Sequence, residues 1–255
     1  MAIEGVAGEV LARDRVASLG RVLAQDRALP LAAELVGLFP ESGLRRGSTV
    51  VVNPGSAPGS TGLALALLSG PSSQGSWCAV VGHPDLGLVA ASQLGADLGH
   101  IALVPHPGKN WAVVTAALLE GMDVVLLCTS HFVPPQRVGA PHARRLEARA
   151  REQGSVLVVL GEDWPGNADV RLSVVANRWH GLGDGFGYLA GGQLEVAAGG
   201  RGAASRPRRA AVRLGVDGLG IFAGASFATL SPGTQGASGD RRQPAHAAKG
   251  GAGCS

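Results

Sequence analysis

Lysine is nearly absent from this sequence of 255 residues: Lys109 and Lys249 are its two lysines, against twenty arginines. Charged residues make up 16% of the chain and the formal net charge is +3, so its overall field is too weak for a histone-like protein. Cysteine is also scarce, since Cys78, Cys128 and Cys254 are odd in number and far apart. This pattern argues against a disulfide framework and a cysteine zinc site, and it fits a reducing compartment.

Long apolar runs are missing as well. None reaches the ~18 residues needed to span a bilayer, and the N-terminus, MAIEGVAGEVLARDRVASLGRV, has early acidic residues and no continuous hydrophobic block. We therefore expect a cytoplasmic protein without membrane contacts. What the chain does contain is 45% apolar residues, enough for a sizeable core.

The first 27 residues favour an amphipathic helix. Val16, Leu19, Val22 and Leu23 recur at helical spacing with charged residues between them. One face of this helix needs a partner, which is either the main domain or another protein, and we expect the main domain, residues 28–200, to follow it.

Short apolar runs then alternate with helical patterns, which predicts an α/β domain with a mainly parallel sheet flanked by helices. The runs lack polar alternation, as in strands covered on both faces. Strands are expected at 48–52, 77–81, 101–104, 123–128 and 155–160, and helices at 61–69, 85–98, 109–120 and 141–153.

The pattern changes after Trp164-Pro165-Gly166. Residues 170–177 and 187–198 alternate more and are separated by a Gly-rich turn, which predicts an antiparallel extension at the C-terminal side of the core. We expect residues 201–214 to be a basic extended segment and residues 215–255 to be a disordered tail of low complexity.

The stretch VVNPGSAPGSTGLALALL, residues 51–68, is typical of the strand, Gly-rich turn and helix that hold a nucleotide phosphate. Aligning Gly59, Ser60 and Thr61 with a Gly-Lys-Thr step puts Pro54 at the first Gly, with Gly55 following, and Ser60 at the Lys. Thr61 could still hold a metal, but the cation that stabilises a transferred phosphate is missing.

Two further parts of an ATPase site are also absent from the sequence. The strand DVVLLC ends in Cys128 rather than in a metal-binding acid, and VVGHPDLG offers only a displaced Asp85 where a catalytic Glu would follow the second strand. Because phosphoryl transfer depends on positioning and charge stabilisation, we expect no enzyme, no metal and no cofactor, with only weak binding of ATP or another anion.

The chain resembles a known family at this point. ESGLRRGSTVVVNPGSAPGSTGLALALL resembles the opening of the RecA ATPase core, and the segments WCAVVGHPDLG, LGADLGHIALVPHPGKNWAVVTAALLEGMDVVLLC and EQGSVLVVLGEDWPGNADVRLSV follow in the order of RecA paralogues that have lost the ATPase. Across roughly residues 28–200 the resemblance is to the ImuA type, including its actinobacterial ImuA-prime form, and more distantly to SulA division inhibitors.

The resemblance implies a function in the SOS response to DNA damage. ImuA-type proteins are accessory proteins of the mutasome, and in translesion synthesis they act with an inactive Y-family polymerase homologue of the ImuB type. Through that homologue they act with an error-prone polymerase and the sliding clamp. A cytoplasmic pseudo-ATPase scaffold, associated with the nucleoid on damage, is the expectation; a SulA-like division inhibitor and a P-loop NTPase with an atypical loop stay open as alternatives.

Two arginine-rich segments are candidate contacts. The segment RGAASRPRRAAVR is predicted to contact either a polyanion, such as weakly bound DNA, or an acidic partner. The contacts would be made by Arg201, Arg206, Arg208, Arg209 and Arg213. For RRLEARAREQ we favour a solvated helix face with ion pairs over a partner or DNA surface.

Two aromatic motifs have simpler interpretations. In WHGLGDG, His180 and Asp184 lack a third metal ligand nearby, and a hairpin turn explains the motif. Trp164-Pro165 is typical of a turn after a strand with a packing anchor, although an exposed Trp164 would be an interface hot spot.

Overall fold

A computed structural model describes residues 28–132, 137–182, 187–215 and 218–221 of the chain. The predicted N-terminal helix and residues 222–255 of the predicted tail lie outside these ranges. In the described part, the strands are β1 (Ala28–Pro30), β2 (Gly43–Arg45), β3 (Thr49–Asn53), β4 (Cys78–Val81), β5 (Ile101–Val104), β6 (Val124–Cys128), β7 (Val156–Leu160), β8 (Val170–Leu182), β9 (Gly187–Gly200), β10 (Arg208–Gly215) and β11 (Gly218–Ile221).

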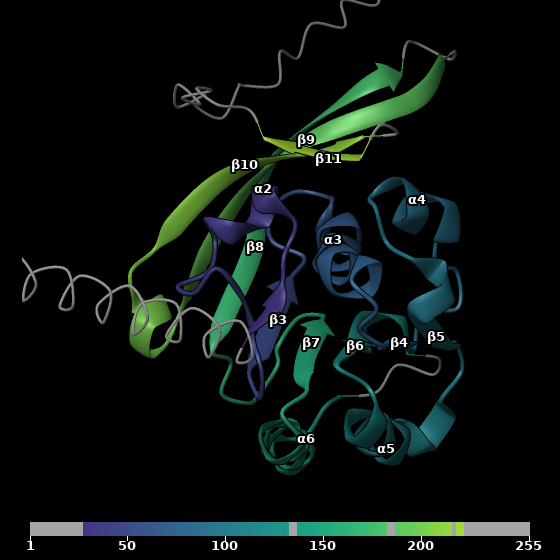
Figure 1. Ribbon diagram of the computed structural model, residues 1–255, viewed down its shortest axis with the longest axis vertical. Coiled ribbons are helices and arrows are strands. Elements are labelled where there is room, and N and C mark those ends of the chain that lie inside the picture. Colours follow the sequence, from purple (N-terminus) through teal and green to yellow (C-terminus); the bar gives the residue numbers. More distant parts are fainter. Residues whose placement is uncertain (1–27, 133–136, 183–186, 216–217, 222–255) are drawn as a thin grey trace, which may run out of the picture. The chain divides into compact units, whose positions relative to one another are not determined.

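Nine of these strands form one sheet, in the order β11-β10-β9-β8-β3-β7-β6-β4-β5 (Figure 1). The pairs from β8 through β3 to β5 are parallel, and β8 to β11 pair antiparallel. The expected α/β class, with a mainly parallel sheet and an antiparallel C-terminal extension, is therefore confirmed. β1 and β2 form a separate antiparallel pair.

Helices cover both faces of the parallel part. They are α2 (Ala33–Val36), α3 (Ser60–Ser73), α4 (Leu88–Gln93), α5 (Trp111–Gly121) and α6 (Ala140–Gln153), with 3₁₀ turns η1 (Leu98–His100), η2 (Gly108–Asn110), η3 (Thr129–His131) and η4 (Gly202–Ser205). α2, α3 and α4 pack on one face and α5 and α6 on the other, as Figure 1 shows. Alternate strand residues therefore enter two different cores, which explains the continuous apolar runs.

Two helices differ from the predicted ranges. α3 continues past the expected end at residue 69 and includes Pro71 in its last turn, where the Ser72 hydroxyl donates to the Leu68 carbonyl oxygen at 2.7 Å. The helix predicted over 85–98 is present but shorter: α4 has six residues, since Gly87 precedes it and Gly95 follows with φ +88°.

The strand β5 is also different from its prediction. It is the edge of the sheet rather than a strand covered on both faces, and the Leu103 side chain is 40% exposed. An edge strand needs cover on fewer sides, so a short apolar run alone does not reveal its position.

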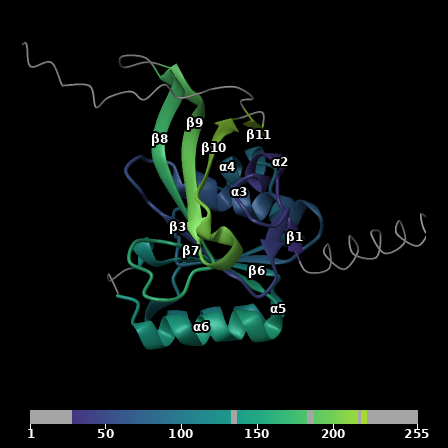
Figure 2. The same cartoon turned by 90° about the vertical axis from the view of Figure 1, so that its left-hand side faces the viewer.

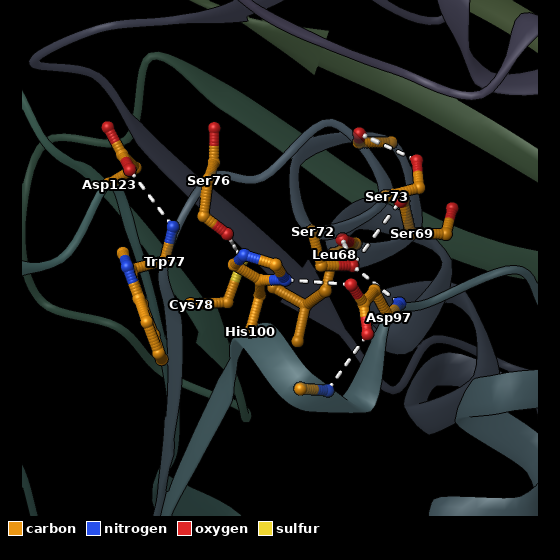
Figure 3. Close-up of polar contacts among 12 residues, drawn as sticks. Leu68, Ser69, Ser72, Ser73, Ser76, Trp77, Cys78, Asp97, His100 and Asp123 are labelled. Carbon is orange, nitrogen blue, oxygen red and sulfur yellow. Dashed lines mark hydrogen bonds and ion pairs between the residues drawn. The ribbon is translucent and has the colours of Figure 1, made fainter.

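Polar contacts join the end of α3 to the approach to β5 (Figure 3). The Asp97 backbone N–H donates to the Ser72 hydroxyl at 3.1 Å, and the Asp97 carboxylate accepts the Gly99 N–H at 2.9 Å and lies 2.7 Å from Nδ1 of His100. The Gly99 N–H, and after it His100, lower the pKa of Asp97 below its ordinary value.

The sheet does not stop at residue 200, the expected end of the core. Of the segment 201–214 that was expected to be extended, Gly202–Ser205 instead form the 3₁₀ turn η4, and Arg208–Gly215 form β10, whose Val212 and Leu214 are buried in the same core as α3. Of the predicted tail, Gly218–Ile221 pairs with β10 as β11. In the described ranges no helix is long and apolar enough to cross a membrane.

Candidate functional site

The loop predicted as a degenerate phosphate cradle lies at the carboxyl end of β3, in the middle of the sheet. Ligands of open α/β sheets bind at this edge. Gly55 and Gly59 have φ of +69° and +129°, where glycine is favoured, and Ser60 and Thr61 open α3. The structure therefore places Pro54, Gly55, Gly59, Ser60 and Thr61 together, in the predicted strand, loop and helix.

The loop is hydrogen-bonded to β8, although Gly55, Ser56 and Pro58 stay exposed to solvent. The Ala57 N–H, of the kind that a phosphate loop directs at its ligand, donates to the Val174 carbonyl oxygen at 3.3 Å. The Asn177 side-chain amide donates to the Pro58 carbonyl oxygen at 2.7 Å. Both contacts join the loop to a strand more than a hundred residues later.

Two more contacts close the space around the loop. The Ser56 hydroxyl donates to the Val175 carbonyl oxygen at 3.0 Å. A Cβ at Gly59 would lie 2.7 Å from Cδ2 of Leu194 on β9, so a side chain already occupies the volume beside the loop. The antiparallel extension thus packs directly beside Gly59.

The nearest cavity at this edge has a volume of about 520 Å³. It is lined by Pro54, Thr129, Ser130, Arg137, Val138, Glu162, Asp163 and Trp164. Its charged groups are one guanidinium and two carboxylates, a balance that disfavours a polyphosphate because phosphate sites concentrate cations.

Glu162 and Asp163 are carboxylates that sequence reasoning missed. They follow β7, whereas the prediction considered the end of β6. The letters GED directly after the apolar run SVLVVL are the signal that could have found them. Asp163 has φ +53°, the one positive value among the described residues other than glycine.

The end of β6 matches its prediction in carrying a thiol instead of an acid. Cys128 is fully buried, and burial raises the pKa of its thiol to about 12. The next hydroxyl, on Thr129, donates to the Leu160 carbonyl oxygen at 3.4 Å. In the described ranges no three His, Cys, Asp or Glu side chains come together as a metal site.

The end of β4 carries an unusual histidine. His83 is 8% exposed, and neither ring nitrogen has a hydrogen-bond partner. Its ring stacks on His131 with centroids 3.9 Å apart. Burial, and then the charge of His131, lower the pKa of His83, while Asp85 opposes this shift. The neutral form of His83 is therefore favoured near neutral pH.

The predicted arginine contacts separate in the structure. Arg209 and Arg213 lie on one face of β10, Arg208 alternates onto the other, and Arg201 and Arg206 flank η4. Two of the five therefore share a surface, because side chains alternate along a strand.

The helix α6 has the predicted ion pairs. Arg149 contacts Glu120 on α5 and Glu152 on its own helix. Glu147 instead is buried and accepts a hydrogen bond from Nε1 of Trp164 at 2.9 Å. Trp164 is thus the predicted packing anchor, and its burial overturns the alternative of an exposed interface hot spot.

The second aromatic motif forms the end of a hairpin. His180 is exposed on β8, and Leu182 pairs with Gly187, which confirms the predicted hairpin. Asp184 lies outside the described residues.

These features define a mixed α/β protein whose loop at the carboxyl end of the central strand is hydrogen-bonded to an antiparallel extension. The chain belongs to the family described as the MT3502 N-terminal domain, which matches residues 37–166 and so includes the loop, His83 and the cavity. It is also similar to uncharacterized protein Rv3395c of Mycobacterium tuberculosis (strain ATCC 25618 / H37Rv), at 36% identity over 148 residues, 55% of this chain and 69% of that protein.

Proposed function

We propose that this protein is a RecA-like scaffold of the ImuA type that lacks ATPase activity and serves in translesion synthesis after DNA damage. The observation that carries the proposal is the loop after β3. It keeps the strand, turn and helix of a phosphate loop but has Ser60 in place of lysine. In addition, the Ala57 N–H donates to the Val174 carbonyl oxygen on β8 rather than to a ligand.

The order of the parallel strands supports the resemblance to the RecA core. β3, the loop and α3 come first, and β4, β6 and β7 follow in parallel on one side of β3. The mycobacterial relative supports an actinobacterial origin of the ImuA-prime kind. On this proposal the protein is cytoplasmic and binds an ImuB-type Y-family polymerase homologue.

A scaffold needs a surface for its partner, and the sheet edge formed by β5 offers one. Trp77, Val89 and Leu103 are 49%, 73% and 40% exposed. Figure 1 shows α4 and β5 along this same edge. Exposed apolar side chains beside an edge strand favour protein binding, because both the side chains and the free backbone groups gain partners.

The first experiment measures nucleotide binding and hydrolysis. We expect Mg-ATP titrated into the purified protein to show no tight site, and ATP turnover to stay at background with and without DNA. A Ser60→Lys variant supplies the missing positive charge. It should still not restore tight binding, because the Ala57 N–H stays hydrogen-bonded to β8 and is not available to a phosphate. DNA-stimulated hydrolysis that Thr61→Ala abolishes would instead establish the alternative, an atypical NTPase.

The second experiment identifies the partner. Tagged protein purified from DNA-damaged cells should retain the Y-family polymerase homologue, and Val89→Ser with Leu103→Ser should reduce its recovery. Trp179→Ser, which alters an exposed side chain on β8, is the matched control and should leave recovery unchanged. Inhibition of the tubulin-like division protein, without recovery of the polymerase homologue, would favour the SulA-like alternative.

A further inference from the structure

The outer face of β8, β9 and β10 carries basic side chains on β8 and β10, with β9 between them. Arg178 on β8 pairs in register with Gln193 on β9, and Gln193 pairs with Arg213 on β10. Arg209 lies four residues before Arg213 on the same face, opposite Ala197. Strand spacing puts the Cα atoms of Arg178 and Arg213 about 10 Å apart, and Arg209 about 13 Å from Arg213.

The opposite face explains why these side chains point outward. Val174, Leu194 and Val212 are buried in the core with α3, so their neighbours along each strand must face away from it. A register shift between Val174 and Ala176 brings Arg178 into the outward row. Figure 2 looks onto this side, and α6 lies below the three strands rather than across them.

The charge on this outer face is positive. Arg178, Arg209 and Arg213 are exposed. The acid of the row, Glu195, is half-buried and lies 3.0 Å from the Arg209 guanidinium. His180 continues the row toward the hairpin end and is also exposed.

The geometry points to this face, defined by Arg178, Arg209 and Arg213, as a binding surface for the phosphate backbone of nucleic acid. Arginine supplies phosphate contacts, and the small Ala211 between Arg209 and Arg213 leaves room for a backbone to approach. The site goes beyond the proposed protein scaffold and does not depend on any polymerase partner.

Binding at this face lacks base recognition. Among the residues of the three strands whose side chains the structure describes, no Phe, Tyr or Trp belongs to the outer row, so bases find no large aromatic platform there. Contacts are then electrostatic, and duplex DNA carries more charge per length than a single strand. We expect duplex DNA to bind at least as tightly as single-stranded DNA of equal length.

The experiment follows the anisotropy of a fluorescently labelled duplex titrated with the full chain. Three phosphate contacts predict a salt slope of about −2.7, so affinity should fall about 20-fold between 50 and 150 mM salt. The variant Arg178→Gln, Arg209→Gln, Arg213→Gln should lose most of that slope and bind at least tenfold more weakly at 50 mM salt.

The control variant removes three exposed arginines from α6, as Arg144→Gln, Arg145→Gln, Arg151→Gln, and lowers the net charge equally. It should bind DNA as the wild type does. Equal losses in both variants, or no effect of the sheet variant, would overturn the assignment. Binding of polyglutamate through the three sheet arginines without binding of DNA would also overturn it, in favour of an acidic protein partner.

Discussion

Replacing His83 with phenylalanine should stabilise the protein and remove part of its sensitivity to acid. His83 is buried with both ring nitrogens unpartnered, between β4 and the stacked ring of His131. A buried polar group without a partner costs about 1–3 kcal/mol. The phenyl ring keeps the stack and removes the unpartnered nitrogens.

The expected gain at pH 7.5 is about 1 kcal/mol. The larger ring adds a packing penalty that offsets part of the relief. In a domain of this size, 1 kcal/mol corresponds to a rise of about 2–4 °C in the melting temperature. His83→Leu, with a smaller side chain, is the second variant, so that a clash specific to phenylalanine is recognised.

The pH dependence gives a sharper test because packing penalties do not change with pH. Burial and His131 lower the pKa of His83 in the folded protein below its ordinary value of 6.5. Between these two values the unfolded chain binds more protons than the folded one. Protonation of His83 therefore costs the wild type no stability above pH 6.5. The free energy of unfolding decreases as the pH falls from 6.5 through the lower pKa that His83 has in the folded protein.

Urea unfolding of wild type and variant from pH 7.5 down to pH 5 measures this difference. The advantage of the His83 variants should grow as the pH falls. His106→Gln, which changes an exposed histidine, is the control and should run parallel to the wild type. Parallel curves for the His83 variants would refute the reasoning, because the histidine would then titrate alike in folded and unfolded chains.

Three further substitutions or labelling tests address the loop and the core. Gly59→Ala should cost about 1–3 kcal/mol in thermal unfolding because of its positive φ, whereas Gly37→Ala, in open space, should change little. Trp164→Phe should cost about 1–3 kcal/mol in urea, since it leaves the buried carboxylate on α6 without a donor; an unchanged midpoint would contradict this. Cys78 and Cys128, with pKa values raised to about 12, should resist iodoacetamide at pH 8 until the protein unfolds, as peptide mass spectrometry will show.

The parallel part of the fold could be predicted from the sequence because the burial of each strand is visible in a short run of consecutive residues. A strand covered by helices on both faces has a continuous apolar run, and SVLVVL predicted Val156–Leu160 to within one residue. The same rule was wrong for the burial of Ile101–Val104, because nothing in four apolar residues distinguishes an edge from a centre. Helix 85–98 was too long for a related reason: its glycines end α4 early.

The candidate site depended on contacts that sequence spacing does not encode. Pro54 to Thr61 were identified as a strand, loop and helix from their composition, but the hydrogen bonds from Ala57 to Val174 and from Asn177 to Pro58 require the register of β8 on β3. Likewise, the register shift after Val174 decides which face Arg178 occupies. These features arise from long-range pairing, which a linear pattern leaves undetermined.

The strands β8 and β9 contact the loop after β3 with one face and form part of the basic surface with the other. Side chains alternate along a strand, so Asn177 on one face can bind the loop while Arg178 faces solvent on the other. On the inner face, the Val174 carbonyl oxygen accepts the Ala57 N–H and Leu194 packs beside Gly59. On the outer face, Arg178 and the arginines of β10 are exposed, where we propose that they contact nucleic-acid phosphates. On our proposals, the same antiparallel extension thus hinders the binding of a small nucleotide at the loop and offers arginines to the backbone of a nucleic acid on its other face.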